Sequence, residues 1–254
     1  MSQPHVPAET AGRPVGWRAL LLTGLVGGAV FAVLVAGGTI VYDSIAESGA
    51  LAALDEPVLA WMVAVRTPFG AQAVTAFTNL GSTVPMVLIG LLLTTVLFAA
   101  TRARTVWFLM LIAAAGSVTF TLVGKPAFGR ARPPLASAVP PYEQGFSLPS
   151  GHTLNSTVVA GMLAYLTVVL VSRTWVRVAA ALAATAWSIA MGLSRVYLGH
   201  HWLSDVVFAW LVGAAWLALV ITVHQAMLER RRNVLEHRSA PAVPADFRSP
   251  PALP

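Results

Sequence analysis

Six long runs without a charged side chain are the feature that most constrains how this chain of 254 residues can fold. A helix of about 20 apolar residues is long enough to cross the hydrocarbon core of a bilayer, which is roughly 30 Å thick. The runs cover residues 19–41, 82–101, 105–124, 153–172, 178–194 and 206–223. Because no water reaches the bilayer core, each crossing segment must satisfy its own backbone hydrogen bonds as a helix. The sequence therefore predicts an all-α fold, a bundle of six transmembrane helices.

The composition agrees with a membrane protein and excludes several kinds of site. Only 10% of the residues are charged, whereas soluble domains carry about 25%. The chain has no cysteine, so neither disulfides nor thiolate metal sites are available. The formal net charge of +6 does not indicate a nucleic-acid partner. Basic residues that flank spans contact anionic lipid, and no stretch interleaves aromatic and basic residues as a nucleic-acid groove does.

Three regions follow from the position of the runs. Residues 1–16 are predicted to be a disordered cytoplasmic leader, 17–224 a six-span domain, and 225–254 a basic, proline-rich, disordered cytoplasmic tail. Arg13 and Arg18 precede the first run, as they would in a signal peptide. The run is longer than a typical signal h-region, however, and no clear A-x-A cleavage site follows. It is therefore predicted to be a retained span.

The segment between the first and second spans has a different pattern. Residues 43–81 carry five charged side chains among short apolar stretches. This pattern is typical of short amphipathic helices that lie in the membrane interface, and it does not decide whether residues 57–65 enter the bilayer. We therefore expect short interfacial helices before the second span.

The distribution of arginine and lysine predicts the orientation. Cytoplasmic loops carry an excess of these residues. Eleven of the sixteen fall on the side of the two termini and five on the other side, four of those five within three unusual polar stretches. Both termini are therefore predicted to be cytoplasmic, and the three polar stretches extracytoplasmic.

The first polar stretch, residues 125–133, contains Lys125, Arg130 and Arg132 within eight residues. A guanidinium group offers paired donors that match a phosphate, and an ammonium group adds a point charge. The stretch is therefore a candidate phosphate site. The alternative is a basic rim that contacts lipid headgroups.

The second stretch, residues 149–152, precedes the fourth run and contains Ser150, Gly151 and His152. The first turn of a helix has unpaired amides that bind anions, although Ser150 is equally consistent with a plain N-cap. The ordinary pKa of histidine, about 6.5, suits His152 to donate a proton to a leaving group.

The third stretch, residues 194–205, places Arg195 before His200, His201 and Asp205. His201 and Asp205 are four residues apart, so on a helix that starts near residue 202 they are neighbours. A carboxylate on one ring nitrogen leaves the other free to attack. The spacing of five to Asp205 points His200 elsewhere, which makes His201 the candidate nucleophile.

Together these stretches predict phosphoryl transfer. The cations and helix-end amides hold a phosphoryl group, His201 attacks phosphorus, and His152 protonates the departing oxygen. Water then hydrolyses the phosphohistidine. Glu143 and Asp205 are the only carboxylates in or between the stretches, and no H-E-x-x-H motif occurs. A two-metal phosphatase would need more acids, so neither a metal nor another cofactor is expected.

These residues resemble a known family. Lys125 with six residues to Arg132-Pro133, then Pro149-Ser-Gly-His152, then Ser194-Arg195 with five residues to His201 and three to Asp205, resembles the three-part signature of the type-2 phosphatidic acid phosphatase superfamily. That superfamily also contains vanadium haloperoxidases, which hold vanadate at a similar site. All three parts match in order, without a gap or a substitution.

The resemblance implies roles for single residues. Phosphate oxygens would be bound by Lys125, Arg132, Ser150, Gly151 and Arg195. His152 would be the general acid, His201 the nucleophile and Asp205 its partner. Arg130 and His200 occupy variable positions of the signature, so no role is carried onto them.

The resemblance also implies a substrate class, a lipid phosphate or diphosphate such as phosphatidate, phosphatidylglycerol phosphate or a polyprenyl diphosphate. We expect an integral-membrane lipid phosphatase, with residues 17–224 as the phosphatase domain, in the plasma membrane of a bacterial cell. Its partners would be its substrate and membrane lipids, with no obligate protein partner and no nucleic acid. Two alternatives remain: a lipid-linked phosphotransferase on the same fold, and a transporter, which predicts charges deep within several spans.

Overall fold

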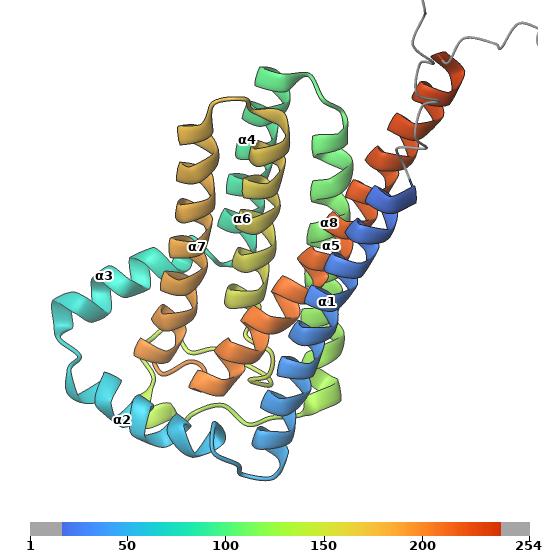
Figure 1. The fold of residues 1–254 in the computed structure, drawn as a ribbon. Coiled ribbons are helices and arrows are strands. Elements are labelled where there is room, and N and C mark those ends of the chain that lie inside the picture. The colour runs from blue at the N-terminus through green and yellow to red at the C-terminus, as the bar shows by residue number, and fades with distance from the viewer. Residues whose placement is uncertain (1–16, 240–254) are drawn as a thin grey trace, which may run out of the picture.

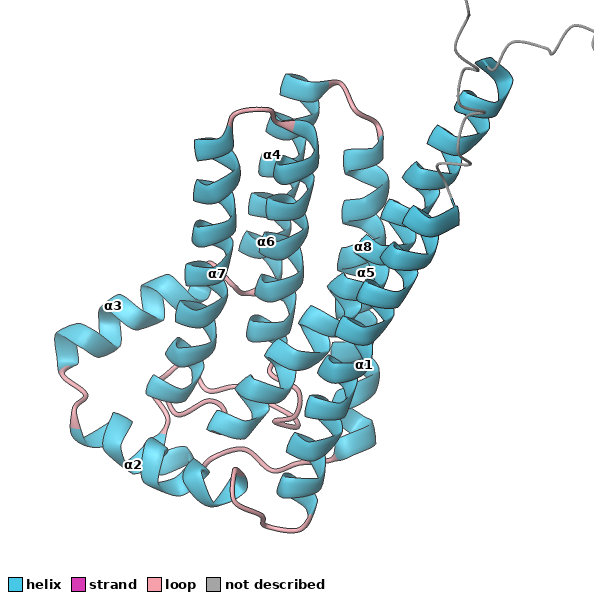
Figure 2. Ribbon diagram, viewed as in Figure 1, coloured by secondary structure: helices cyan, strands magenta, loops and turns pink. Residues whose placement is uncertain are grey.

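A computed structural model describes residues 17–239 of the chain, and the side chains of residues 17–235 (Figure 1). The described part is helical and contains no β-strand (Figure 2). The α-helices are α1 (Trp17–Ala46), α2 (Asp55–Ala64), α3 (Pro68–Asn79), α4 (Thr83–Thr101), α5 (Thr105–Phe128), α6 (Gly151–Leu170), α7 (Thr174–Tyr197) and α8 (Leu203–Ser239). Two short 3₁₀ turns, η1 (Ala52–Leu54) and η2 (Leu135–Ser137), lie in the connections.

Six of these helices are long and apolar enough to cross a membrane: α1, α4, α5, α6, α7 and α8. They contain the six predicted runs to within two residues at the ends of α4 and α6, which confirms the predicted all-α class and six-span bundle. Large apolar side chains such as Leu25, Val33, Leu92 and Leu111 are each more than 60% exposed on the outer faces. Surfaces of this kind are stable in contact with lipid and not in water. The chain is therefore a multi-pass membrane protein.

Helix α6 lies at the centre of the bundle and packs against α4, α5, α7 and α8. Its side chains Leu154, Val158 and Met162 are fully buried and form the core with Val106 of α5 and Ala209 of α8. Helix α1 runs beside α8 over most of its length (Figure 1). The core thus joins α6 to the two helices that carry the first and third polar stretches.

Helices α2 and α3 connect α1 to α4 at the end of the bundle far from the described ends of the chain (Figure 1). Thr67 begins α3 as an N-cap, because its hydroxyl accepts a hydrogen bond from Gly70 N at 3.0 Å and Pro68 follows in the first turn. With 10 and 12 residues, α2 and α3 are about 15 to 18 Å long. Neither can cross a bilayer alone, as expected of interfacial helices, and residues 57–64 belong to α2.

The tail begins later than the sequence predicted. Helix α8 continues from the last apolar run through Ser239, so residues 225–239 are helical and not disordered. Residues such as Gln225, Met227, Leu228 and Glu229 are good helix formers, and they extend the helix once the buried part has nucleated it. The predicted leader over residues 1–16 and the rest of the predicted tail, 240–254, lie outside the described residues.

Candidate active site

The three polar stretches meet at one end of the bundle, opposite the described ends of the chain (Figure 1). The α5–α6 connection, residues 129–150, crosses this end and lies against the turn between α7 and α8. That turn depends on Gly199, whose φ is +71° and whose position would put a Cβ 2.2 Å from the carbonyl oxygen of Ser137. Only glycine fits both requirements. The turn brings the end of α7 and the start of α8 to the connection.

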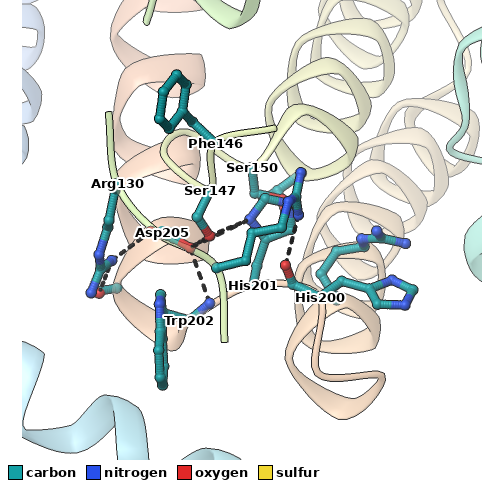
Figure 3. A network of polar contacts seen from close by, with 12 residues as sticks. Arg130, Phe146, Ser147, Ser150, His200, His201, Trp202 and Asp205 are labelled. Atoms are coloured by element: carbon teal, nitrogen blue, oxygen red, sulfur yellow. Dashed lines mark hydrogen bonds and ion pairs between the residues drawn. The ribbon is translucent and has the colours of Figure 1, made fainter. Parts of the chain in front are cut away.

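His201 and Asp205 are in contact, as their spacing predicted. His201 Nδ1 lies 3.4 Å from Asp205 Oδ2, and the two side chains are 1% and 0% exposed. The same Oδ2 accepts hydrogen bonds from the backbone amide of Trp202, at 3.0 Å, and from the hydroxyl of Ser147 (Figure 3). The Trp202 amide and the Ser147 hydroxyl therefore hold the Asp205 carboxylate beside the imidazole ring.

The other ring nitrogen of His201 faces a cation. Arg132 Nη1 lies 3.2 Å from His201 Nε2 and also donates to the carbonyl of His200 at 2.7 Å. A guanidinium group can only donate, so Nε2 acts as the acceptor and the ring proton is on Nδ1, toward Asp205. In this tautomer the Nε2 lone pair, which here accepts from Arg132, is the one that an attacking nitrogen uses.

Glu143, in the α5–α6 connection, connects the cations of the site. Its carboxylate lies 3.1 Å from Arg132 Nη2 and forms an ion pair with Arg195 Nη2. It also lies 3.7 Å from His152 Nδ1 and 3.7 Å from His201 Nε2. Residues from α6, α7, the α5–α6 connection and the α7–α8 turn therefore surround one anionic group.

Burial alone would raise the pKa of Glu143, but its surroundings do the opposite. Its contact with the His201 ring and the positive charge of Arg195 hold the pKa of this carboxyl well below its ordinary value. Glu143 is therefore ionised at neutral pH. The site thus stabilises a negative charge at this position.

Arg195 is 1% exposed and is held from two sides. Its Nη1 donates to Thr78 Oγ1 of α3 at 3.0 Å, while Nη2 pairs with Glu143. Ser194, the preceding residue, also donates to Thr78 Oγ1 at 3.0 Å. The second interfacial helix therefore orients a predicted phosphate ligand.

The remaining predicted phosphate ligands lie around the start of α6 and the end of α5. Ser150 is fully buried at the N-cap position of α6, and its hydroxyl lies 2.9 Å from Thr153 Oγ1. Gly151 begins the helix, and a Cβ there would lie 3.0 Å from Thr121 of α5. Lys125 Nζ donates to the carbonyl of Phe146 at 2.8 Å.

His200 lies outside this group, as its spacing predicted. Its ring turns away from His201 (Figure 3), and its Nε2 lies 2.7 Å from the carbonyl oxygen of Val139. Burial and the nearby positive charge of Arg195 lower the pKa of His200 to about 4. The ring is therefore neutral at neutral pH and anchors the α5–α6 connection.

Four residues in the site were not assigned a role from the sequence: Asp55, Arg130, Glu143 and Ser147. Arg130 forms ion pairs with Asp205, at 2.5 Å, and with Asp55 of α2, at 2.7 Å. A buried charge needs a partner. The sequence could therefore have indicated Arg130 as one of the cations available to pair with Asp205. Asp55 and Ser147 are 149 and 58 residues from their partners Ser204 and Asp205. No local spacing could indicate these contacts. Within the described residues, no group of three or more histidine, aspartate or glutamate side chains is arranged to hold a metal ion.

The chain is similar to a known protein family. A family model for the PAP2 superfamily matches residues 104–228. Phosphatidylglycerophosphatase B of Bacillus subtilis (strain 168) is 28% identical over 181 residues, which are 68% of this chain and 85% of that protein. All three signature stretches lie within residues 104–228, which the family model matches, whereas Asp55 of α2 and Thr78 of α3 lie outside them.

Two solved structures share the fold. The crystal structure of a transmembrane PAP2-type phosphatidylglycerolphosphate phosphatase from Bacillus subtilis has a TM-score of 0.67 and 24% identity, over 78% of this chain and 95% of that one. The crystal structure of Aquifex aeolicus LpxE has a TM-score of 0.51 and 19% identity, over 67% and 95%. With the signature read from the sequence, these matches confirm the predicted family: the chain belongs to the PAP2 superfamily.

Proposed function

We propose that this protein is an integral-membrane lipid phosphatase that works through a phosphohistidine intermediate and without a metal ion. As a PAP2 member it is a phosphoric ester hydrolase. The observation that carries the mechanism is the convergence of His201 Nε2, His152, Arg132 and Arg195 on the carboxylate of Glu143. A cluster that holds one anion in this way can hold a phosphoryl group in the same place.

In the proposed reaction, Arg132, Arg195 and Lys125 bind phosphoryl oxygens, assisted by Ser150 and the amide of Gly151. His201 Nε2 attacks phosphorus, the bond from phosphorus to the lipid oxygen breaks, and His152 gives its proton to that oxygen. Asp205 stabilises the ring as it becomes positively charged.

The second half-reaction reverses the roles of the histidines. Water attacks phosphorus, gives its proton to His152, and the bond from phosphorus to His201 breaks to release phosphate. The cations stabilise charge on the equatorial oxygens in both steps.

An apolar cavity supports a lipid as the substrate. It has a volume of about 540 Å³, lies between α4, α6 and α7, and is lined by side chains such as Leu80, Leu93, Leu163 and Trp187. Leu80 is followed by Gly81, where a methyl group would be 3.3 Å from the His152 ring. An acyl chain in this cavity would therefore place its headgroup next to the proposed general acid.

The side of the membrane follows from the charge distribution. The α4–α5 connection contains Arg102 and Arg104, and the α6–α7 connection and the first turn of α7 contain Arg173 and Arg177. Both lie at the same end as the described ends of the chain, opposite the site (Figure 1). The positive-inside rule therefore supports cytoplasmic termini and an extracytoplasmic site in a bacterial plasma membrane. Because the chain has no cysteine, a single Gln144→Cys variant can be labelled in intact cells with a membrane-impermeant maleimide. Labelling only after lysis would contradict this orientation.

Phosphate release from purified protein in detergent and EDTA tests the activity. Phosphatidylglycerol phosphate should be assayed first, because the similar Bacillus protein is named for it, beside phosphatidate and undecaprenyl diphosphate. We expect release from at least one lipid, and none from His201→Ala protein that inserts normally. A requirement for added divalent metal, or full activity of His201→Ala, would refute the mechanism. Transfer of the phosphoryl group to another lipid without free phosphate would indicate a phosphotransferase.

A further inference from the structure

Arg130 joins two carboxylates that are far apart in the sequence. Its Nη1 lies 2.5 Å from Asp205 Oδ1 and 2.7 Å from Ser204 Oγ, and its Nη2 lies 2.7 Å from Asp55 Oδ2. Its guanidinium also lies 5.9 Å from the centre of the Trp202 ring. Figure 3 shows Arg130 approaching Asp205 from the side away from His200. The guanidinium is therefore held in one orientation by contacts with α2 and α8.

Asp55 binds the start of α8 as well as Arg130. Its Oδ1 accepts from the backbone amide of Ser204 at 2.8 Å, and its Oδ2 accepts from Ser204 Oγ at 2.6 Å. The first amides of a helix have no partner within the helix, and a carboxylate there also stabilises the helix dipole. Asp55 of α2 therefore caps the N-terminus of α8, in the way that an N-cap side chain of α8 itself would.

The contacts of Asp205 are divided between its two oxygens. Oδ1 faces Arg130, while Oδ2 faces Ser147, the Trp202 amide and His201 Nδ1. The cation on Oδ1 thus decides which oxygen is turned to the imidazole. It also balances a carboxylate that is fully buried, where an unpaired charge would be costly.

We propose that Asp55 and Arg130 are positioning residues, which hold Asp205 against His201 and thereby connect the interfacial helix α2 to the nucleophile. This inference rests on the proposed function, in which His201 attacks phosphorus. Neither residue touches the substrate in that mechanism. Both act through the orientation and charge of Asp205.

Charge removal at the two positions has opposite effects on the pH profile. Without Arg130, the negative charge of Asp205 is less balanced and stabilises protonated His201 more, so the acid limb of the rate profile moves to higher pH. Without the negative charge of Asp55, Arg130 balances the charge of Asp205 more fully and protonated His201 is stabilised less. The acid limb of the rate profile then moves to lower pH. Each shift should be about one pH unit. The other charged or titratable groups around His201 are Lys125, Arg132, Glu143, His152, Arg195 and His200, and they are the same in every variant.

The test compares Arg130→Gln, Arg130→Lys and Asp55→Asn with wild type, in the same lipid-phosphate assay. Glu56→Gln is the matched control, because Glu56 is the exposed neighbour of Asp55 on α2. We expect kcat to fall roughly 100-fold in Arg130→Gln, the loss typical of a catalytic group displaced by about 1 Å, with KM nearly unchanged. Arg130→Lys should recover part of the loss, since lysine keeps the charge but not both contacts. Glu56→Gln should match wild type.

The double variant Asp55→Asn/Arg130→Gln should lose no more activity than the worse single variant, because the two residues act as one unit. Wild-type kcat in Arg130→Gln, or shifts of both single variants in the same direction, would overturn the inference while leaving the proposed function intact. If Arg130→Gln does not fold, the Asp55→Asn pH profile decides alone. Inactive wild-type protein on every lipid would instead overturn the proposed function and this inference with it.

Discussion

The replacement of Glu143 by glutamine gives a direct test of how the site holds an anion. In the proposed mechanism the phosphoryl group lies where the Glu143 carboxylate lies now, so substrate must displace it from Arg132 and Arg195. A charge-assisted hydrogen bond contributes about 1.5 to 3 kcal/mol and a neutral one about 0.5 to 1.5 kcal/mol. For two contacts, glutamine should be easier to displace by about 2 to 3 kcal/mol. This corresponds to roughly 30- to 150-fold tighter binding of an anion.

Orthovanadate is a suitable probe, because its affinity can be measured without turnover. Titration of purified Glu143→Gln protein, followed by isothermal calorimetry and by inhibition of phosphate release, should give the lower dissociation constant. Glu56→Gln removes the same charge from an exposed position and should leave vanadate affinity unchanged. Unchanged or weaker binding to Glu143→Gln would refute the reasoning, and would mean that Glu143 orients the cations for the phosphoryl group and does not compete with it.

Three other substitutions test separate parts of the structure. Ala164→Phe fills the cavity between α4, α6 and α7 and should raise KM about tenfold for a long-chain lipid, which corresponds to the loss of about two buried methylene groups. An equal rise in KM for a short-chain phosphate would argue against acyl-chain binding. His152→Ala should lower kcat by a factor of roughly 10² to 10⁴ for a lipid phosphate, and by much less for an aryl phosphate, whose leaving group needs no proton. An equal loss of kcat on both substrates would show that His152 is not the general acid. Gly199→Ala should destabilise the protein by about 2 to 4 kcal/mol, because its Cβ would overlap the carbonyl of Ser137; an unchanged thermal unfolding midpoint would contradict this account of the turn.

The fold was predictable because its main determinants are local. The length and lack of charge of each apolar run can be seen in that run alone. A segment of this kind in a bilayer must form a helix, independently of the neighbouring segments. The end of α8 was predicted too early because the prediction followed the apolar pattern alone. Residues 225–239 are largely polar, but they keep a high helix propensity.

The site was predictable where its residues are close in the sequence or share a recognisable signature. The spacing of four between His201 and Asp205 led to the observed contact of 3.4 Å, and the spacing of five correctly separated His200 from it. Glu143 is different. It is a single acid in a long connection, and only folding shows that two arginines and two histidines surround it.

The sequence by itself determined the membrane class, the number of spans, the superfamily and the identity of the candidate nucleophile, because each of these depends on local composition or short spacing. Only the tertiary structure decided which charges compensate one another. Asp55 and Asp205 are 150 positions apart, yet Arg130 pairs with both, and Thr78 of an interfacial helix holds Arg195. Charges buried near a bilayer need partners within a few ångströms. Which partners they find depends on how the helices pack, a property that no single stretch of the chain contains.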